Sequence, residues 1–220
     1  KLASQLAKLQ QADPEPRGAA ALKIGILLFT LTRFDDALAM FAQATDNRDR
    51  NWFQAMALTH MKRYADAADA FGRARDKGCD GAIVDLKLAE LAALADDTAG
   101  ATKMLKKLEK SMGADAGYHC VLGLVAQLDG FSDDAFDAFE KALELDSDCA
   151  EAMFRLAYFC DLHGDEDRAL ELYDACTSRP PVHANALLNM AILHEDAGRY
   201  AKAVAALDRI LASNPNHARA

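Results

Sequence analysis

Three side chains in the last third of the chain carry the atoms that metal chemistry and nucleophilic chemistry require. Cys160 and His163 lie three residues apart, and His194 follows Cys160 by 34 residues. A thiolate and two imidazoles can bind zinc, but tetrahedral sites usually bring paired ligands at short spacing, which this sequence lacks. A nucleophilic thiolate needs a fixed base and an electropositive pocket, for which the sequence offers no motif. We therefore predict no metal site and no catalytic residue.

Two further segments carry charges that could hold ions or phosphate. Asp146-Ser147-Asp148 begins like a calcium loop, but Cys149 and Ala150 follow where oxygen ligands and a glycine are needed. The one basic face at helical spacing is formed by Lys103, Lys106, Lys107 and Lys110. It lacks the interleaved aromatic residues of an RNA-binding surface, and the chain has no glycine-rich phosphate loop. The sequence therefore predicts a solvated helix face, no cofactor and no enzyme activity.

Composition indicates the class of protein that positions these side chains. The 220 residues include 25 Lys and Arg against 34 Asp and Glu, a net charge of −9, and 51% are hydrophobic. Such a chain can bury a core, and its acidity disfavours direct contact with nucleic acid. The best candidate for a membrane span, Ile24 to Leu31, is too short to cross a bilayer. Its 5 cysteines, without a Cys-x-x-Cys pair, favour a reducing, cytoplasmic environment.

The chain repeats itself with a period of 34 residues. Alanine recurs at this spacing at Ala67, Ala101, Ala135, Ala169 and Ala203, and Ala37 precedes this series by 30 residues. Four positions after each alanine stands a large apolar residue: Phe41, Phe71, Leu105, Phe139, Tyr173 and Leu207. Twelve positions before each alanine stands a small residue: Gly25, Ala55, Ala89, Gly123, Ala157 and Ala191. Such a period is typical of an array of helix pairs.

This pattern resembles the tetratricopeptide repeat (TPR), in which small residues let two antiparallel helices approach and large residues fill the gaps. The resemblance implies an all-α fold, a right-handed α-α superhelix or TPR solenoid of antiparallel helix pairs. It gives six repeats, at 18–47, 48–81, 82–115, 116–149, 150–183 and 184–217. Gly130, Gly164 and Gly198 fall in the turn between the helices of the last three repeats, where a positive φ is needed.

Some parts of the chain depart from this pattern. The first repeat is four residues short before the next one begins, and the third is placed by phase alone. Residues 1–17 keep the phase with a stripe of Leu2, Leu6 and Leu9, and resemble the second helix of a truncated preceding repeat. Residues 218–220 resemble the start of a helix that is cut off. We therefore expect the natural protein to continue in both directions.

In TPR proteins the first helix of each repeat lines a concave groove. The resemblance implies a non-catalytic protein-protein interaction scaffold that binds a partner peptide or helix there. The expected bed is mostly apolar, with aromatic anchors of the kind that dominate binding energy. In the alternative interpretation, the same stripe packs tightly and leaves little groove open. The predicted groove residues are Leu22, Ile26, Trp52, Met56, Leu86, Glu90, Leu124, Phe154, Arg155, Tyr158, Asp161, Leu188, Asn189, Ile192 and Glu195.

The groove residues also indicate which partners fit. TPR proteins that hold the tails of the chaperones Hsp70 and Hsp90 clamp the terminal carboxylate with lysines. At the corresponding positions this chain has Cys120 and Leu124, then Arg155, then Asn185 and Asn189, so we predict no such tail. An acidic cluster of Asp161, Glu195 and Asp196 favours a basic partner segment if it faces the groove, and is otherwise a solvated edge.

Two alternatives stay open on the sequence. The last two repeats are similar to bacterial TPR proteins that carry a domain like the C-terminal domain of the RNA polymerase α subunit. That similarity implies a partner-binding arm of a transcription-associated protein. The other alternative is a self-assembly module, since repeat ends with apolar second-helix faces such as Val204, Leu207 and Leu211 could stack into a homo-oligomer.

Overall fold

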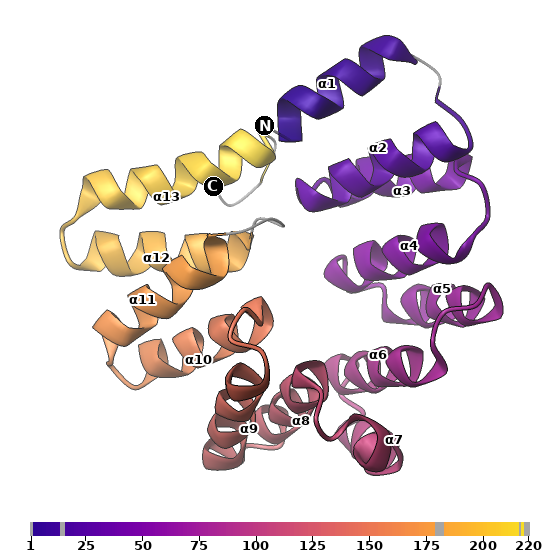
Figure 1. Ribbon diagram of the computed structural model, residues 1–220. Helices are drawn as coiled ribbons and strands as arrows, with labels where there is room; N and C mark the ends of the chain where they lie inside the picture. The colour runs from indigo at the N-terminus through magenta and orange to yellow at the C-terminus, as the bar shows by residue number, and fades with distance from the viewer. Residues whose placement is uncertain (1, 14–15, 179–182, 216, 218–220) are drawn as a thin grey trace. The chain divides into compact units, whose positions relative to one another are not determined.

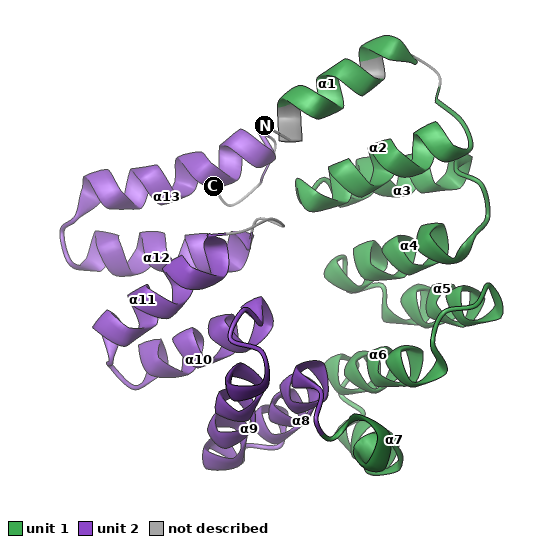
Figure 2. Cartoon of the chain, in the orientation of Figure 1, with its two compact units in different colours: residues 1–113 green, residues 114–220 purple. Residues whose placement is uncertain are grey.

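A computed structural model describes residues 2–13, 16–178, 183–215 and 217 (Figure 1). Its regular elements there are all α-helices, which confirms the predicted all-α fold class. Two compact units divide the chain, residues 1–113 and residues 114–220 (Figure 2). Pro181, which stands 34 residues before Pro215 at the end of a repeat, lies outside the described residues. The predicted helix start at 218–220 also lies outside them.

The first unit consists of successive helices that each contact the next one along the chain. Its helices are α1 (Leu2–Ala12), α2 (Ala19–Thr30), α3 (Phe34–Gln43), α4 (Arg48–His60), α5 (Tyr64–Asp76), α6 (Gly81–Leu94) and α7 (Thr98–Met112). Leu6 of α1 is buried in the same cluster as Phe41 of α3, so the first helix shares the core of this unit. The repeat boundaries themselves stay a prediction.

The second unit has the same construction. Its helices are α8 (Ala116–Leu128), α9 (Ser132–Leu145), α10 (Ala150–Leu162), α11 (Glu166–Thr177), α12 (Ala184–Asp196) and α13 (Tyr200–Ser213). The largest buried cluster of this unit includes Tyr173, Leu187 and Ile210, from three successive helices. Each helix pair thus buries its apolar stripe against the next pair, as a repeat array requires.

The periodic alanines and large residues form the contacts between paired helices. Four of the alanines are fully buried: Ala37, Ala67, Ala101 and Ala169. The large side chains Phe41, Phe71 and Tyr173 are at most 1% exposed. A Cβ atom added to Gly123 of α8 would lie 2.7 Å from the ring of Phe139 in α9. A small residue at this place is therefore what lets the two helices approach.

All six turns within the helix pairs use the left-handed region of φ. Gly130, Gly164 and Gly198 have φ values of 84°, 79° and 70°, which confirms the predicted turn glycines. The first three turns place Thr32, Lys62 and Asp96 there instead, at φ 58°, 58° and 65°. The same backbone bonds close each turn: the amide of Arg63 donates to the carbonyl of Leu58 at 2.9 Å, for example. These are Schellman ends, and three of them place a side chain where glycine is favoured.

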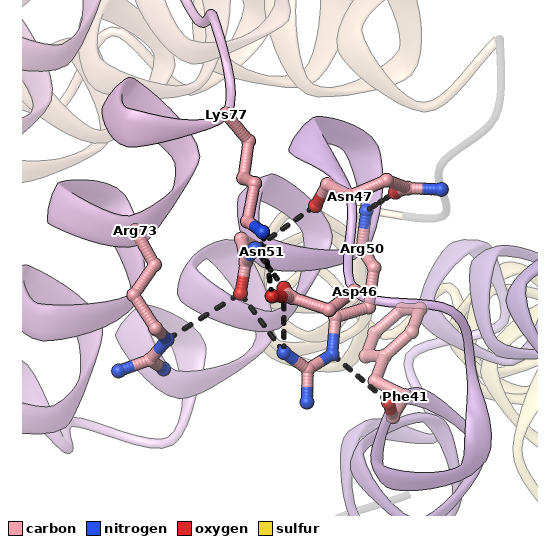
Figure 3. Close-up of polar contacts among 7 residues, drawn as sticks. All are labelled: Phe41, Asp46, Asn47, Arg50, Asn51, Arg73 and Lys77. Carbon is pink, nitrogen blue, oxygen red and sulfur yellow. Dashed lines mark hydrogen bonds and ion pairs between the residues drawn. The ribbon is translucent and has the colours of Figure 1, made fainter.

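A polar network links α3, α4 and α5 at the place where the first repeat is four residues short (Figure 3). Asn51 lies at its centre and is fully buried. Its amide donates to Asp46 at 2.7 Å and to the carbonyl of Asn47 at 2.9 Å, and accepts from Arg50 at 3.0 Å and Arg73 at 3.4 Å. All the polar capacity of this buried side chain is thereby used, which holds the short loop in one conformation.

Charged groups complete this network at its solvent side. Lys77 forms an ion pair with Asp46 at 3.0 Å. Arg50 donates from Nε to the carbonyl of Phe41, near the end of α3, at 3.0 Å. Hydrogen bonds from Lys77 and Asn51 hold the pKa of Asp46 below its usual value. The loop therefore carries an ionised carboxylate that links the side chains of α4 and α5.

Candidate functional site

A hollow of about 360 Å³ lies between α10 and α12 in the second unit. Phe154, Tyr158 and Leu188 supply its apolar lining, and Arg155, Asn185 and Asn189 supply its polar groups. Both helices are the first of their pair. Residues three or four apart share one face of each helix, and these faces lie on the same side of the unit. The structure thus brings together five of the predicted groove residues and adds Asn185.

One polar chain fixes the floor of this hollow. Asn189 donates from Nδ2 to the hydroxyl of Tyr173 at 2.8 Å, and that hydroxyl donates to Asp161 at 3.3 Å. The ring of Tyr173 is fully buried, and burial raises the pKa of its hydroxyl, so the group stays protonated. Asn189 is therefore held in one orientation before any partner arrives, which lowers the entropic cost of binding.

Arg155 provides the positive charge of the hollow. It donates from Nε to Glu151 at 2.7 Å, one turn earlier in α10, and its guanidinium lies 5.9 Å from the ring centroid of Phe154. The ring of Phe154 packs in turn against His183, with centroids 4.3 Å apart, and against Tyr173 at 6.0 Å. The ring of Phe154 is thus held by its neighbours, whereas the side chain of Tyr158 is 37% exposed to solvent.

The apolar surface continues beyond the hollow. Ile192, one turn after Leu188 on α12, is 50% exposed, and Leu162 at the end of α10 is 64% exposed. Glu195 on α12 is exposed, whereas Asp161 is half-buried under the hydroxyl of Tyr173. The acidic groups therefore border the same face as the exposed apolar side chains.

The other predicted groove residues of the first helices lie outside this hollow. Leu86 and Leu124 are 5% exposed, each within its own unit. In the first unit, Glu90 pairs with Lys87 at 2.7 Å. The remaining four are half-buried against the core clusters of that unit: Leu22, Ile26, Trp52 and Met56. Their part in a groove stays a prediction.

The residues considered for other chemistry lie apart from this hollow. Cys160 and His194 are buried, and His163 stacks on Phe159 with ring centroids 4.0 Å apart. Within the described ranges, no group of three or more His, Cys, Asp or Glu could hold a metal ion. The four lysines of the basic face are exposed on α7. No helix in the described part of the chain is long and apolar enough to cross a membrane.

Asn185 lines the hollow but is absent from the predicted groove residues. Its spacing of four from Asn189 on one helix is the sequence signal that the two share a face. Two amides on one face can both donate and accept, which matches the alternating groups of a peptide backbone.

Family models for the tetratricopeptide repeat match residues 22–78, 120–181 and 162–220, which together exceed half of the chain. The chain therefore belongs to the tetratricopeptide repeat family, and it is a protein-interaction scaffold. The wider resemblance to TPR proteins with an RNA polymerase α-like domain has no support among these matches.

Curated relatives and solved structures agree with this family. Photosystem I assembly protein Ycf3 of Prochlorococcus marinus (strain NATL1A) is 32% identical over 109 residues, which are 46% of this chain and 63% of that protein. Ycf3 of Synechococcus sp. (strain CC9311) is 34% identical over 83 residues, 36% of this chain and 48% of that protein. The matches thus span about half to three fifths of those relatives' own length.

Two solved structures share the fold at low sequence identity. A tetratricopeptide repeat protein from Parabacteroides merdae has a TM-score of 0.60 at 12% identity, covering 97% of this chain and 87% of that one. MamA has a TM-score of 0.52 at 21% identity, covering 74% of this chain and 95% of that one.

Proposed function

We propose that the second unit binds an extended segment of a partner protein in the hollow between α10 and α12, without catalysis. The observation that carries this proposal is the convergence of Phe154, Arg155, Tyr158, Leu188 and Asn189 on one hollow of about 360 Å³. Apolar walls with a few fixed polar groups are the usual composition of a binding site. The remaining predicted groove residues stay a prediction.

The polar groups suggest how the segment is held. Asn185 and Asn189 are placed to hydrogen-bond its backbone, and Arg155 is placed to donate to a carboxylate or carbonyl oxygen. Tyr158 and Ile192 present apolar surface for one or two of its side chains. The acidic border at Glu195 favours a basic residue in the flanking part of the segment.

The role of the curated relatives supports the same kind of function. Ycf3 is a photosystem I assembly protein, a role that is compatible with binding to other proteins. We place this chain in the same broad class, as a non-enzymatic factor that holds a protein partner. A cytoplasmic location, with neither Hsp70 nor Hsp90 tails as partners, is part of this proposal.

The test is an affinity comparison between two matched surface double variants. Tyr158→Ala/Ile192→Ala removes exposed apolar surface next to the hollow, and Tyr200→Ala/Val204→Ala removes comparable surface from α13, where these residues are 66% and 56% exposed. A partner is captured from source cells with the wild-type chain, and its segment is then synthesised and titrated. We expect the first variant to bind at least about tenfold more weakly.

The control variant separates this proposal from the self-assembly alternative. Loss of affinity with Tyr200→Ala/Val204→Ala alone would contradict the hollow as the binding site and move it to α13. Concentration-dependent light scattering that changes with the same variant would support stacking through the repeat ends, where Leu207 and Leu211 are half-buried and Val204 is exposed.

A further inference from the structure

Two cysteines in the second unit lie in direct contact, although 29 positions separate them in the sequence. The sulfur atoms of Cys120 and Cys149 are 3.4 Å apart, with one thiol donating to the other. Cys120 lies in the second turn of α8, and Cys149 is the residue that precedes the first turn of α10. Both are thiols and not a disulfide in this structure.

The surroundings hold the two sulfurs together. Cys120 packs in one small cluster with Ala142 and Ala152, and Cys149 packs against that cluster. A disulfide has an S–S length of about 2.05 Å, so the sulfurs need to approach each other by about 1.4 Å. Small movements of the two side chains allow such an approach, because the other buried members of the cluster, Ala142 and Ala152, are small, although Leu143 also packs against it.

We propose that Cys120 and Cys149 are a reactive dithiol that disulfide oxidants such as oxidised glutathione convert to an intramolecular disulfide. Cys149 is the attacking residue, since its side chain is half-buried whereas that of Cys120 is 7% exposed. Cys120 is then the resolving residue, already in contact with its target sulfur. This inference rests on the two sulfurs and is independent of the proposed peptide binding.

The electrostatics around Cys149 favour this assignment. The hydrogen bond from Cys120 lowers the pKa of Cys149 to about 7, against the opposing effect of burial, and the backbone amide of Ala152 helps. The carboxylates of Asp146 and Glu151 act in the other direction. A thiol with a pKa near ambient pH is the most effective attacking group in disulfide exchange.

The exchange balances in two steps. The thiolate of Cys149 attacks one sulfur of oxidised glutathione, breaks its S–S bond and releases one glutathione thiolate. The thiol of Cys120 then loses its proton and attacks the Cys149 sulfur of this mixed disulfide, releasing the second glutathione thiolate. The two cysteines lose two electrons, the two glutathiones gain them, and each glutathione thiolate takes up one proton.

The bond would tie α8 to the start of α10 across the whole of α9. Closing a loop of this size restricts the unfolded chain, so the disulfide form should be more resistant to heat. From the usual effect of such a loop, we expect the Tm of the second unit to rise by about 5 to 10 °C. Removing the reductant or adding it back would therefore change the thermal stability of the second unit.

The experiment equilibrates the full chain with mixtures of oxidised and reduced glutathione and maps the peptides without reduction. We expect a linked pair of peptides that contain Cys120 and Cys149, no glutathione on either one, and the higher Tm. Cys120→Ser should instead accumulate a mixed disulfide of Cys149 with glutathione, because the resolving thiol is missing. Cys176→Ser is the matched control and should form the Cys120–Cys149 bond like the wild type.

Three results would overturn the proposal. One is a wild-type chain whose Cys149 stays glutathionylated, because Cys120 then does not resolve it. Another is the absence of any modification under oxidising mixtures that modify an unfolded chain. The last is a disulfide between Cys120 or Cys149 and another cysteine of the folded chain that forms as readily as the Cys120–Cys149 bond. Circular dichroism of both serine variants checks whether they keep their helices, and Cys149→Ser provides a second variant if Cys120→Ser loses them.

Discussion

Asn189 on α12 donates a hydrogen bond of 2.8 Å to the hydroxyl of Tyr173 on α11, and this bond joins the core of the second unit to its surface hollow. The ring of Tyr173 belongs to the buried cluster, while the amide of Asn189 lines the hollow. A residue of the repeat's packing framework therefore also orients a residue of the candidate binding site.

Tyr173→Phe tests this link. The change keeps the ring but leaves Asn189 without its acceptor and Asp161 without its donor, so we expect a loss of about 1 to 2 kcal/mol in the free energy of unfolding. Urea titration followed by circular dichroism measures it. Tyr158→Phe, in an exposed position, should stay within about 0.5 kcal/mol of the wild type. Equal stability of the two variants would contradict the link.

Asn51→Ala tests the network that closes the shortened first repeat. It removes a fully buried amide, so Asp46, Arg50 and Arg73 each lose one hydrogen-bond partner. We expect a loss of about 2 to 3 kcal/mol in the stability of the first unit. The exposed Asp69→Ala in the same unit is the control and should have little effect. A similar small effect for Asn51→Ala would show that water replaces the network without cost.

Lys62→Gly tests the turns of the first three helix pairs. Lys62 occupies the left-handed region at φ 58°, where a Cβ atom is unfavourable, so we expect a gain of about 1 kcal/mol in stability. Gly130→Ala makes the opposite change at φ 84°, with no atom within 4 Å of the added Cβ, and should lose about as much. Thermal unfolding of the two variants gives the sign of each effect. Shifts in the same direction would exclude backbone conformation as the cause.

The pH dependence of alkylation tests the environment of Cys149. Its pKa is lowered to about 7, chiefly by the hydrogen bond from Cys120, whereas burial raises the pKa of Cys176 to about 12. The thiolate fraction of Cys149 therefore rises as the pH increases through 7, and that of Cys176 stays small up to pH 9. We expect the rate of iodoacetamide labelling at Cys149 to reach half its maximum near pH 7.

A variant identifies the cause of this shift. Cys120→Ala removes the hydrogen bond, while the opposing carboxylates of Asp146 and Glu151 remain. The labelling profile of Cys149 should then move upward, to an ordinary thiol pKa of about 8.5 or above. Peptide mass spectrometry follows each cysteine separately. An unchanged profile in Cys120→Ala would assign the shift to the N-terminus of α10 instead.

The sequence alone was sufficient to predict the helical array because its signal is periodic. Buried alanines at fixed spacing, such as Ala135 and Ala169, and large residues such as Phe139, identify which faces must meet. The turn glycines followed from the need for positive φ at Gly130 and Gly164. Every repeat supplies the same information, so the irregular third repeat could still be placed by phase.

Features that break the period could not be predicted. The network around Asn51 lies where the chain is shorter than one period, and nothing in the sequence pairs Asn51 with Arg73. The contact between Cys120 and Cys149 depends on how α9 brings two repeat positions together, which the column pattern does not specify. The left-handed conformation of Lys62 could not be predicted, because a lysine side chain carries no turn signal.

The candidate site was predicted in part. The family pattern placed Phe154, Tyr158 and Asn189 on one face, and the structure places them around one hollow. The same pattern did not distinguish Tyr158, which is exposed, from Leu124, which is buried, because burial depends on how closely neighbouring helices pack. The binding role of all these residues stays a prediction.

Site-specific photo-crosslinking tests the central claim most directly. A photoreactive phenylalanine analogue replaces Ile192, beside the hollow, or Val204 on α13; the two side chains are similarly exposed, at 50% and 56%. With the partner segment bound, we predict a crosslink from position 192 that an excess of unlabelled segment abolishes, and none from position 204. A crosslink from position 204 alone would contradict binding in the hollow between α10 and α12.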